Sequence, residues 1–184
     1  KKYKNLMKNF VLFLTYTRIL CAPIIFILII FFSEFTASLF LFILAAISDY
    51  FDGVLARRFK VSSELGAILD PIADKVLLLF LLFAIAISTQ NNYIGLFAAI
   101  ILAREFWVSA LREYNSKKQN TAKTDVTFLA KAKTTFQFSA IALYLFGMAY
   151  QAQLVIFLGS FVFFIALLLS IKTGLNYTKA TFFD

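Results

Sequence analysis

The sequence predicts an all-α integral membrane protein with six transmembrane helices and both termini in the cytoplasm. Three observations predict this fold class: the apolar composition, the length of the apolar segments and the distribution of positive charge. Of the 184 residues, 61% are hydrophobic and the mean hydropathy is +0.84, whereas soluble domains are about half apolar. The length fits a single membrane domain over residues 1–184.

Six apolar segments are each close to the roughly 20 residues that a helix needs to cross the hydrocarbon core. They cover residues 10–32, 37–55, 67–88, 93–111, 127–149 and 154–171. Pro23 and Pro71 are the two prolines. Both fall within a predicted helix or at its start, where membrane helices accommodate proline.

The positive charge predicts the orientation. All 18 Lys and Arg residues fall in the N-terminal stretch, the connections after the second and fourth segments, the C-terminal tail, or the segment ends beside them. The opposite connections carry Glu34 as their one charged residue. The positive-inside rule therefore places both termini in the cytoplasm. The basic N-terminus leads into an apolar span without a small-residue cleavage site, which favours an anchor over a removed signal peptide.

The net charge of +8 indicates anionic lipid headgroups and phosphates as partners, and not nucleic acid, because the basic residues alternate with apolar spans. The single cysteine, Cys21, excludes an intrachain disulfide.

Four aspartates lie within or at the ends of the second and third segments: Asp49, Asp52, Asp70 and Asp74. A carboxylate at membrane depth costs about 2.5 kcal/mol or more, so each is a candidate functional residue. Spacings of three and four place each pair on one helical face. Antiparallel helices joined near residue 62 would bring the pairs to similar depth. The alternative is that each carboxylate forms an ordinary ion pair with a neighbouring Arg57, Arg58 or Lys75.

Four converging carboxylates repel one another unless cations neutralise them. Coordination by oxygen alone favours Mg²⁺, Mn²⁺ or Ca²⁺ over Zn²⁺. Two such ions about 4 Å apart are a known arrangement for phosphoryl displacement. The chain has no histidine, so a general base must be a carboxylate, a lysine, a tyrosine or a metal-bound water.

Small and basic residues surround these aspartates. Gly53, Ala56 and Gly66 would let a helix or a ligand approach closely, and for the glycines helix packing is an equally good explanation. Arg57 offers a planar fork that suits a phosphate.

Together these residues resemble the signature of the CDP-alcohol phosphatidyltransferases. The match covers all eight fixed positions at the expected spacing: Asp49, Asp52, Gly53, Ala56, Arg57, Gly66, Asp70 and Asp74. Segments 70–75, 103–105, 109–113 and 131–135 are similar to the phosphatidylglycerophosphate synthases within that family. In that group an Asn-Pro-Asn-type segment usually precedes Thr15, whereas this chain has Val11 and Leu12 where Pro and Asn are expected.

The resemblance implies transfer of the phosphatidyl group of CDP-diacylglycerol to an alcohol, with release of CMP. The distribution of positive charge and the depth of the aspartates predict that this site faces the cytoplasm, in a multi-pass protein of the inner or plasma membrane. The resemblance implies two Mg²⁺ or Mn²⁺ ions on Asp49, Asp52 and Asp70, with Asp74 as a further ligand or as the general base. It also implies a homodimer. The residues implied to bind the CDP-lipid are Thr15, Arg18, Asp52, Gly53, Ala56, Arg57 and Gly66.

The basic residues of the later segments favour glycerol 3-phosphate as the acceptor. Arg104 and Arg112 are eight residues apart, close to one helical face, and cations can hold a phosphate dianion. The full set of candidate phosphate ligands is Lys75, Arg104, Arg112, Lys131 and Lys133. The positive-inside bias alone explains residues such as Lys117 and Lys118.

Two alternatives remain open. Another acceptor, such as inositol phosphate, serine or phosphatidylglycerol, is possible within the family. In a different class, the carboxylates could line the pathway of a small cation transporter. The outer halves of the segments lack ionisable residues, which weighs against a polar route across the membrane.

Overall fold

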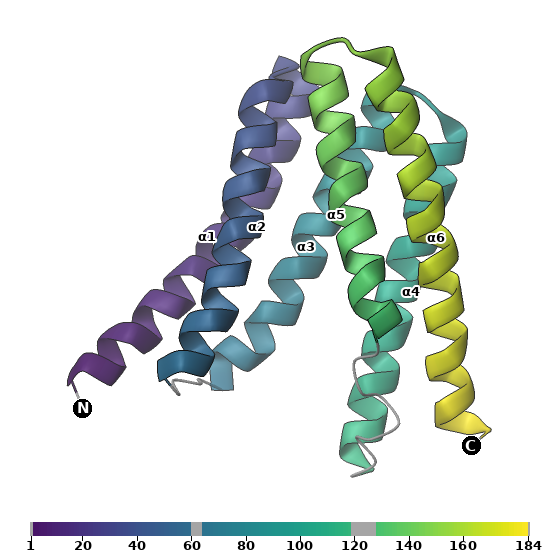
Figure 1. The fold of residues 1–184 in the computed structure, drawn as a ribbon. Coiled ribbons are helices and arrows are strands. Elements are labelled where there is room, and N and C mark those ends of the chain that lie inside the picture. The colour runs from purple at the N-terminus through teal and green to yellow at the C-terminus, as the bar shows by residue number, and fades with distance from the viewer. Residues whose placement is uncertain (1, 60–63, 119–127, 184) are drawn as a thin grey trace. The chain divides into compact units, whose positions relative to one another are not determined.

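The structure is a computed structural model that describes residues 2–59, 64–118 and 128–183. These residues form six α-helices and no strand, which confirms the predicted fold class (Figure 1). The helices are α1 (Lys2–Phe32), α2 (Phe35–Phe59), α3 (Glu64–Thr89), α4 (Asn92–Lys117), α5 (Phe128–Ala149) and α6 (Gln153–Phe182). Pro23 lies inside α1 and Pro71 inside α3.

Within the described residues, four helices are long and apolar enough to cross a membrane. They are α1 over Asn9–Phe32, α3 over Ile68–Thr89, α4 and α6. The apolar part of α2 is shorter, Phe35–Phe51. Large apolar side chains such as Phe13, Phe31 and Phe157 are exposed, as expected for surfaces that face lipid. The chain is therefore a multi-pass membrane protein, and the orientation of its termini stays a prediction.

The chain divides into two compact units, Lys1–Ala84 and Ile85–Asp184, with the boundary inside α3. The single domain predicted over 1–184 stays a prediction. In the first unit, α1 packs along α2, and small or branched side chains such as Ala22, Ile25 and Ala45 are buried. Phe26 of α1 contacts Phe80 of α3 edge to face, with ring centroids 5.7 Å apart.

In the second unit, α6 packs against both α5 and α4. Glycine permits the close approach of α5 and α6, because a Cβ atom on Gly147 would lie 2.6 Å from Ile156 Cγ1 and 3.0 Å from its backbone nitrogen. The Tyr144 hydroxyl donates to Ser160 Oγ at 2.9 Å across the same pair of helices. The pairing of α4 with α6 continues past the end of the predicted apolar segment 154–171, where Trp107 Nε1 of α4 donates to Thr178 Oγ1 of α6 at 2.8 Å.

Candidate functional site

In the first unit, three of the predicted aspartates contact one face of α1. Arg18 Nη1 lies 2.7 Å from Asp49 Oδ1 of α2 and 2.8 Å from Asp74 Oδ1 of α3. One helical turn earlier, Thr15 Oγ1 donates to Asp70 Oδ1 at 2.8 Å. Residues three apart share a helical face, so α1 joins both aspartate-bearing helices.

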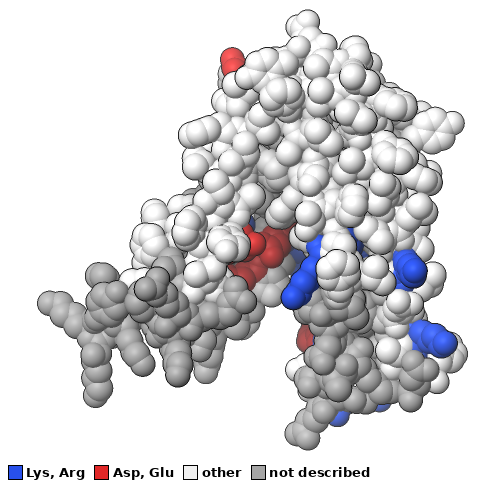
Figure 2. Space-filling view, viewed as in Figure 1, with Lys and Arg blue, Asp and Glu red and all other residues white. Residues whose placement is uncertain are grey.

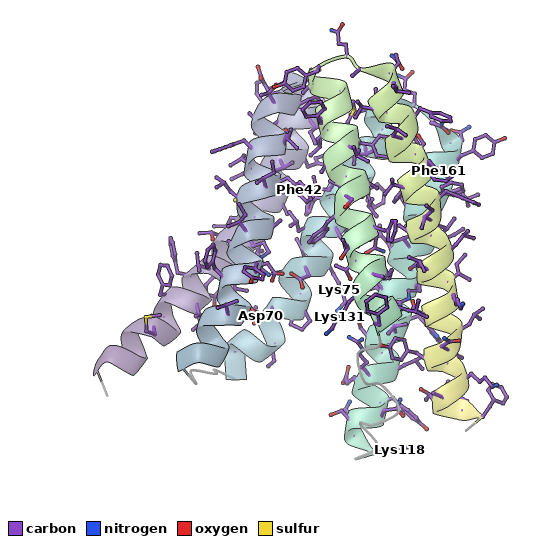
Figure 3. The ribbon with its side chains drawn as sticks, in the orientation of Figure 1. Phe42, Asp70, Lys75, Lys118, Lys131 and Phe161 are labelled. Atoms are coloured by element: carbon purple, nitrogen blue, oxygen red, sulfur yellow. The ribbon has the colours of Figure 1, made fainter. Side chains whose placement is uncertain are left out.

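Arg18 is far more buried than the two carboxylates that it contacts. The Arg18 side chain is 1% exposed, whereas those of Asp49 and Asp74 are 43% and 49% exposed. Arg18 therefore lies on the inner side of the carboxylates, which remain partly accessible from outside. Figure 2 shows acidic side chains in red at the molecular surface, and Figure 3 labels Asp70 on α3. A buried guanidinium is tolerated because the paired carboxylates compensate for its lost hydration.

The chemistry of this set fits Mg²⁺ or Mn²⁺. The ligand atoms are carboxylate oxygens, and the Oδ1 atoms of Asp49, Asp70 and Asp74 contact Arg18 or Thr15 of α1. Among the side chains that the structure describes, no three carboxylates are close enough together to form a metal-binding group. The Asp52 side chain lies outside them, three residues after Asp49 on α2.

The other predicted CDP-lipid residues flank the aspartates in the chain. Gly53 is exposed on α2 and Gly66 is buried on α3. Ala56 and Arg57 are in the last turns of α2, and their side chains lie outside the described part. Lys75, predicted for the acceptor phosphate, is half-buried on α3 next to Asp74.

In the second unit, a buried charged cluster joins α4 and α5. Glu105 Oε1 accepts hydrogen bonds from Lys133 Nζ and from Arg104 Nη1, the latter at 3.2 Å. The side chains of Glu105, Arg104 and Lys133 are 16%, 9% and 7% exposed. Glu105 thus neutralises part of the charge of Arg104 and Lys133, two cations predicted to bind the acceptor phosphate.

Arg104 also binds α6. Its Nε donates to the Ser170 carbonyl oxygen at 3.0 Å, and its Nη2 donates to Thr173 Oγ1 at 2.7 Å. A Cβ atom on Gly174 would lie 3.0 Å from Arg104 Cγ, so glycine makes room for this side chain. Because all three guanidinium nitrogens donate within the unit, Arg104 connects α4 to α6.

Arg112 and Lys131 are more open. Arg112 Nη2 donates to the Tyr177 hydroxyl at 3.2 Å, and the guanidinium carbon lies 5.2 Å from the centre of the Tyr177 ring. The Arg112 side chain is nevertheless exposed, as is Lys131 in the first turn of α5 (Figure 3). These two cations are the members of the predicted acceptor set best placed in this unit to meet an anion, whereas Lys133 is buried beside Glu105.

The sequence alone did not predict the hydrogen-bond partners of Arg104, Arg112 and Lys133. Glu105 carried a usable signal, because a carboxylate inside an apolar segment is a functional candidate in its own right. Ser170, Thr173 and Tyr177 carried none, since uncharged polar residues near the end of a span are common and their partners lie more than 60 positions away in the sequence.

Known proteins resemble the chain over most of its length. Residues 9–172 match a family model described as CDP-alcohol phosphatidyltransferase. The chain is 35% identical over 170 residues to the CDP-diacylglycerol–glycerol-3-phosphate 3-phosphatidyltransferase of Escherichia coli (strain K12), which covers 91% of each chain. The protein of that name from Cereibacter sphaeroides is 45% identical over 138 residues, covering 73% of this chain and 62% of the relative. The family match includes all four aspartates and all the predicted acceptor cations.

Proposed function

This chain belongs to the CDP-alcohol phosphatidyltransferase family, and from that premise we propose that it transfers the phosphatidyl group of CDP-diacylglycerol to glycerol 3-phosphate. The products are phosphatidylglycerophosphate and CMP, formed at the cytoplasmic face of the inner or plasma membrane. The observation that carries the proposal is the convergence of Asp49, Asp70 and Asp74 on Arg18 and Thr15 of α1. The names of the relatives support the donor and the acceptor.

Asp49, Asp52, Asp70 and Asp74 would hold two Mg²⁺ or Mn²⁺ ions. Such ions neutralise a diphosphate and stabilise the negative charge on a departing CMP. The partial exposure of the Asp49 and Asp74 side chains supports this role. The CDP group would be bordered by the backbone around Gly53 and Gly66, together with Ala56 and Arg57. Thr15 and Arg18 of α1 would support this CDP-lipid site.

The chain's own chemical contribution is proton removal and orientation. The acceptor hydroxyl oxygen forms a bond to the phosphorus that carries the diacylglycerol. The bond from that phosphorus to the bridging oxygen breaks, and CMP leaves with that oxygen. Asp74 takes the hydroxyl proton, because its Oδ1 is held by Arg18 while half of its side chain is exposed.

The acceptor phosphate would be bound by the exposed cations Arg112 and Lys131. Arg104 and Lys133 would support them from within the unit, since both already bond to Glu105. The phosphate distinguishes glycerol 3-phosphate from uncharged or zwitterionic acceptors, because a dianion gains most from several cations.

The test is CMP release from CDP-diacylglycerol by the purified protein, with glycerol 3-phosphate, inositol phosphate, serine or phosphatidylglycerol as acceptor. We expect release to require a divalent metal and to be fastest with glycerol 3-phosphate. Faster release with another acceptor would overturn the acceptor assignment while leaving the CDP-lipid chemistry in place.

Arg112→Ala should raise the KM for glycerol 3-phosphate about ten-fold or more and change the KM for CDP-diacylglycerol little. A charge-assisted hydrogen bond contributes about 1.5–3 kcal/mol, and 1.4 kcal/mol corresponds to about ten-fold in affinity. Lys117→Ala is the matched control, because Lys117 lies on the same helix in an exposed pair with Glu113. Equal increases in both KM values would count against the acceptor role of Arg112.

A further inference from the structure

One nitrogen atom of Arg18 contacts carboxylates from two helices. Its Nη1 is within 2.8 Å of Oδ1 of both Asp49 and Asp74, which come from α2 and α3. The guanidinium is buried, while both carboxylates remain accessible on their other side. We propose that Arg18 is a positioning residue for the metal ligands, which holds these two partly exposed carboxylates together. This inference rests on the proposed function, which assigns Asp49 and Asp74 to the metal site.

Removing Arg18 could change metal binding in either direction, and the sign of the change tests the proposal. A guanidinium beside a metal site repels a divalent cation, so charge alone predicts that removing Arg18 strengthens metal binding. Preorganisation predicts that removing it weakens metal binding, because two like-charged carboxylates then separate and must be brought together again. The geometry favours preorganisation, since the guanidinium is buried and bonded to both carboxylates, while nearly half of each carboxylate side chain stays exposed.

Thr15 extends the same arrangement to a third aspartate. Its buried hydroxyl donates to Asp70 Oδ1 at 2.8 Å, one helical turn from Arg18 on α1. Helix α1 would therefore fix the metal ligands of both neighbouring helices from their inner side. This role differs from direct contact with the nucleotide, and it acts on the CDP-lipid through the aspartates.

The experiment measures Mn²⁺ affinity of the purified, metal-free full-length protein in detergent, by electron paramagnetic resonance of free Mn²⁺. Arg18→Gln should lower the affinity at least ten-fold, and Arg18→Lys, which keeps the charge without the planar group, should lie between that variant and the wild type. Arg104→Gln is the matched control, because it removes an equally well-bonded arginine from the other unit. It should lower the melting temperature and leave Mn²⁺ affinity unchanged.

Each outcome decides one claim. Unchanged or tighter Mn²⁺ binding by Arg18→Gln would show that Arg18 only neutralises charge, and would overturn the inference. If that variant does not fold, Arg18→Lys decides alone, and wild-type affinity in it overturns the inference. A wild-type protein without Mn²⁺ affinity would instead refute the proposed metal site.

Discussion

Asp74→Asn should lower CMP release from CDP-diacylglycerol by about a thousand-fold or more, because general-base catalysis contributes roughly 10² to 10⁴ in rate and the variant also loses a metal ligand. Asparagine keeps the shape of the side chain and an oxygen that can accept the bond from Arg18 Nη1, which is 2.8 Å long in the wild type. The loss should therefore appear in activity more than in folding. The measurement is CMP release with glycerol 3-phosphate, alongside the melting temperature.

Mn²⁺ affinity separates the two roles of Asp74. An inactive variant with nearly normal Mn²⁺ affinity indicates a general base, whereas a parallel loss of both indicates a ligand. Glu34→Gln is the control, since this carboxylate is exposed in the connection before α2 and should retain wild-type activity. Full activity of Asp74→Asn would refute the catalytic assignment.

The sequence was sufficient to predict where the helices lie, because the length of an apolar run is a direct consequence of bilayer thickness. The predicted segments ended too early, since α2 continues to Phe59 and α6 to Phe182. Polar residues past the apolar segment continue the helix when they have partners, as Asn115 Nδ2 does with Thr181 Oγ1 at 2.8 Å. Hydropathy cannot detect such contacts, since they depend on a second helix.

The candidate site was predictable as a set of residues and not as a set of contacts. Spacing showed that Asp70 and Asp74 share a face of one helix, because helical periodicity is local. That Arg18 would contact Asp74, 56 positions away, required knowing which faces of α1 and α3 meet. The same limit explains Arg104, whose charge suggested a phosphate ligand but whose nitrogens bind Glu105, Ser170 and Thr173.

Glu105→Gln should destabilise the protein by about 3 kcal/mol, because removing one partner of a buried ion pair leaves an uncompensated charge. Glu105 accepts from both Lys133 and Arg104, so the substitution leaves two largely buried cations without their shared carboxylate. Gln has nearly the same shape, which isolates the effect of charge from that of packing. The measurement is the melting temperature in detergent, which should fall by several degrees.

Two comparisons make this prediction specific to the buried cluster. Glu113→Gln removes the carboxylate of an exposed pair with Lys117 on the same helix and should leave the melting temperature unchanged, because solvent screens such pairs. Combining Glu105→Gln with Lys133→Met should cost less than the sum of the single changes, since the second change removes the cation that the first leaves unpaired. Strict additivity would show that Glu105 and Lys133 do not stabilise each other, and α4 and α5 would then be held in place mainly by α6, against which both pack.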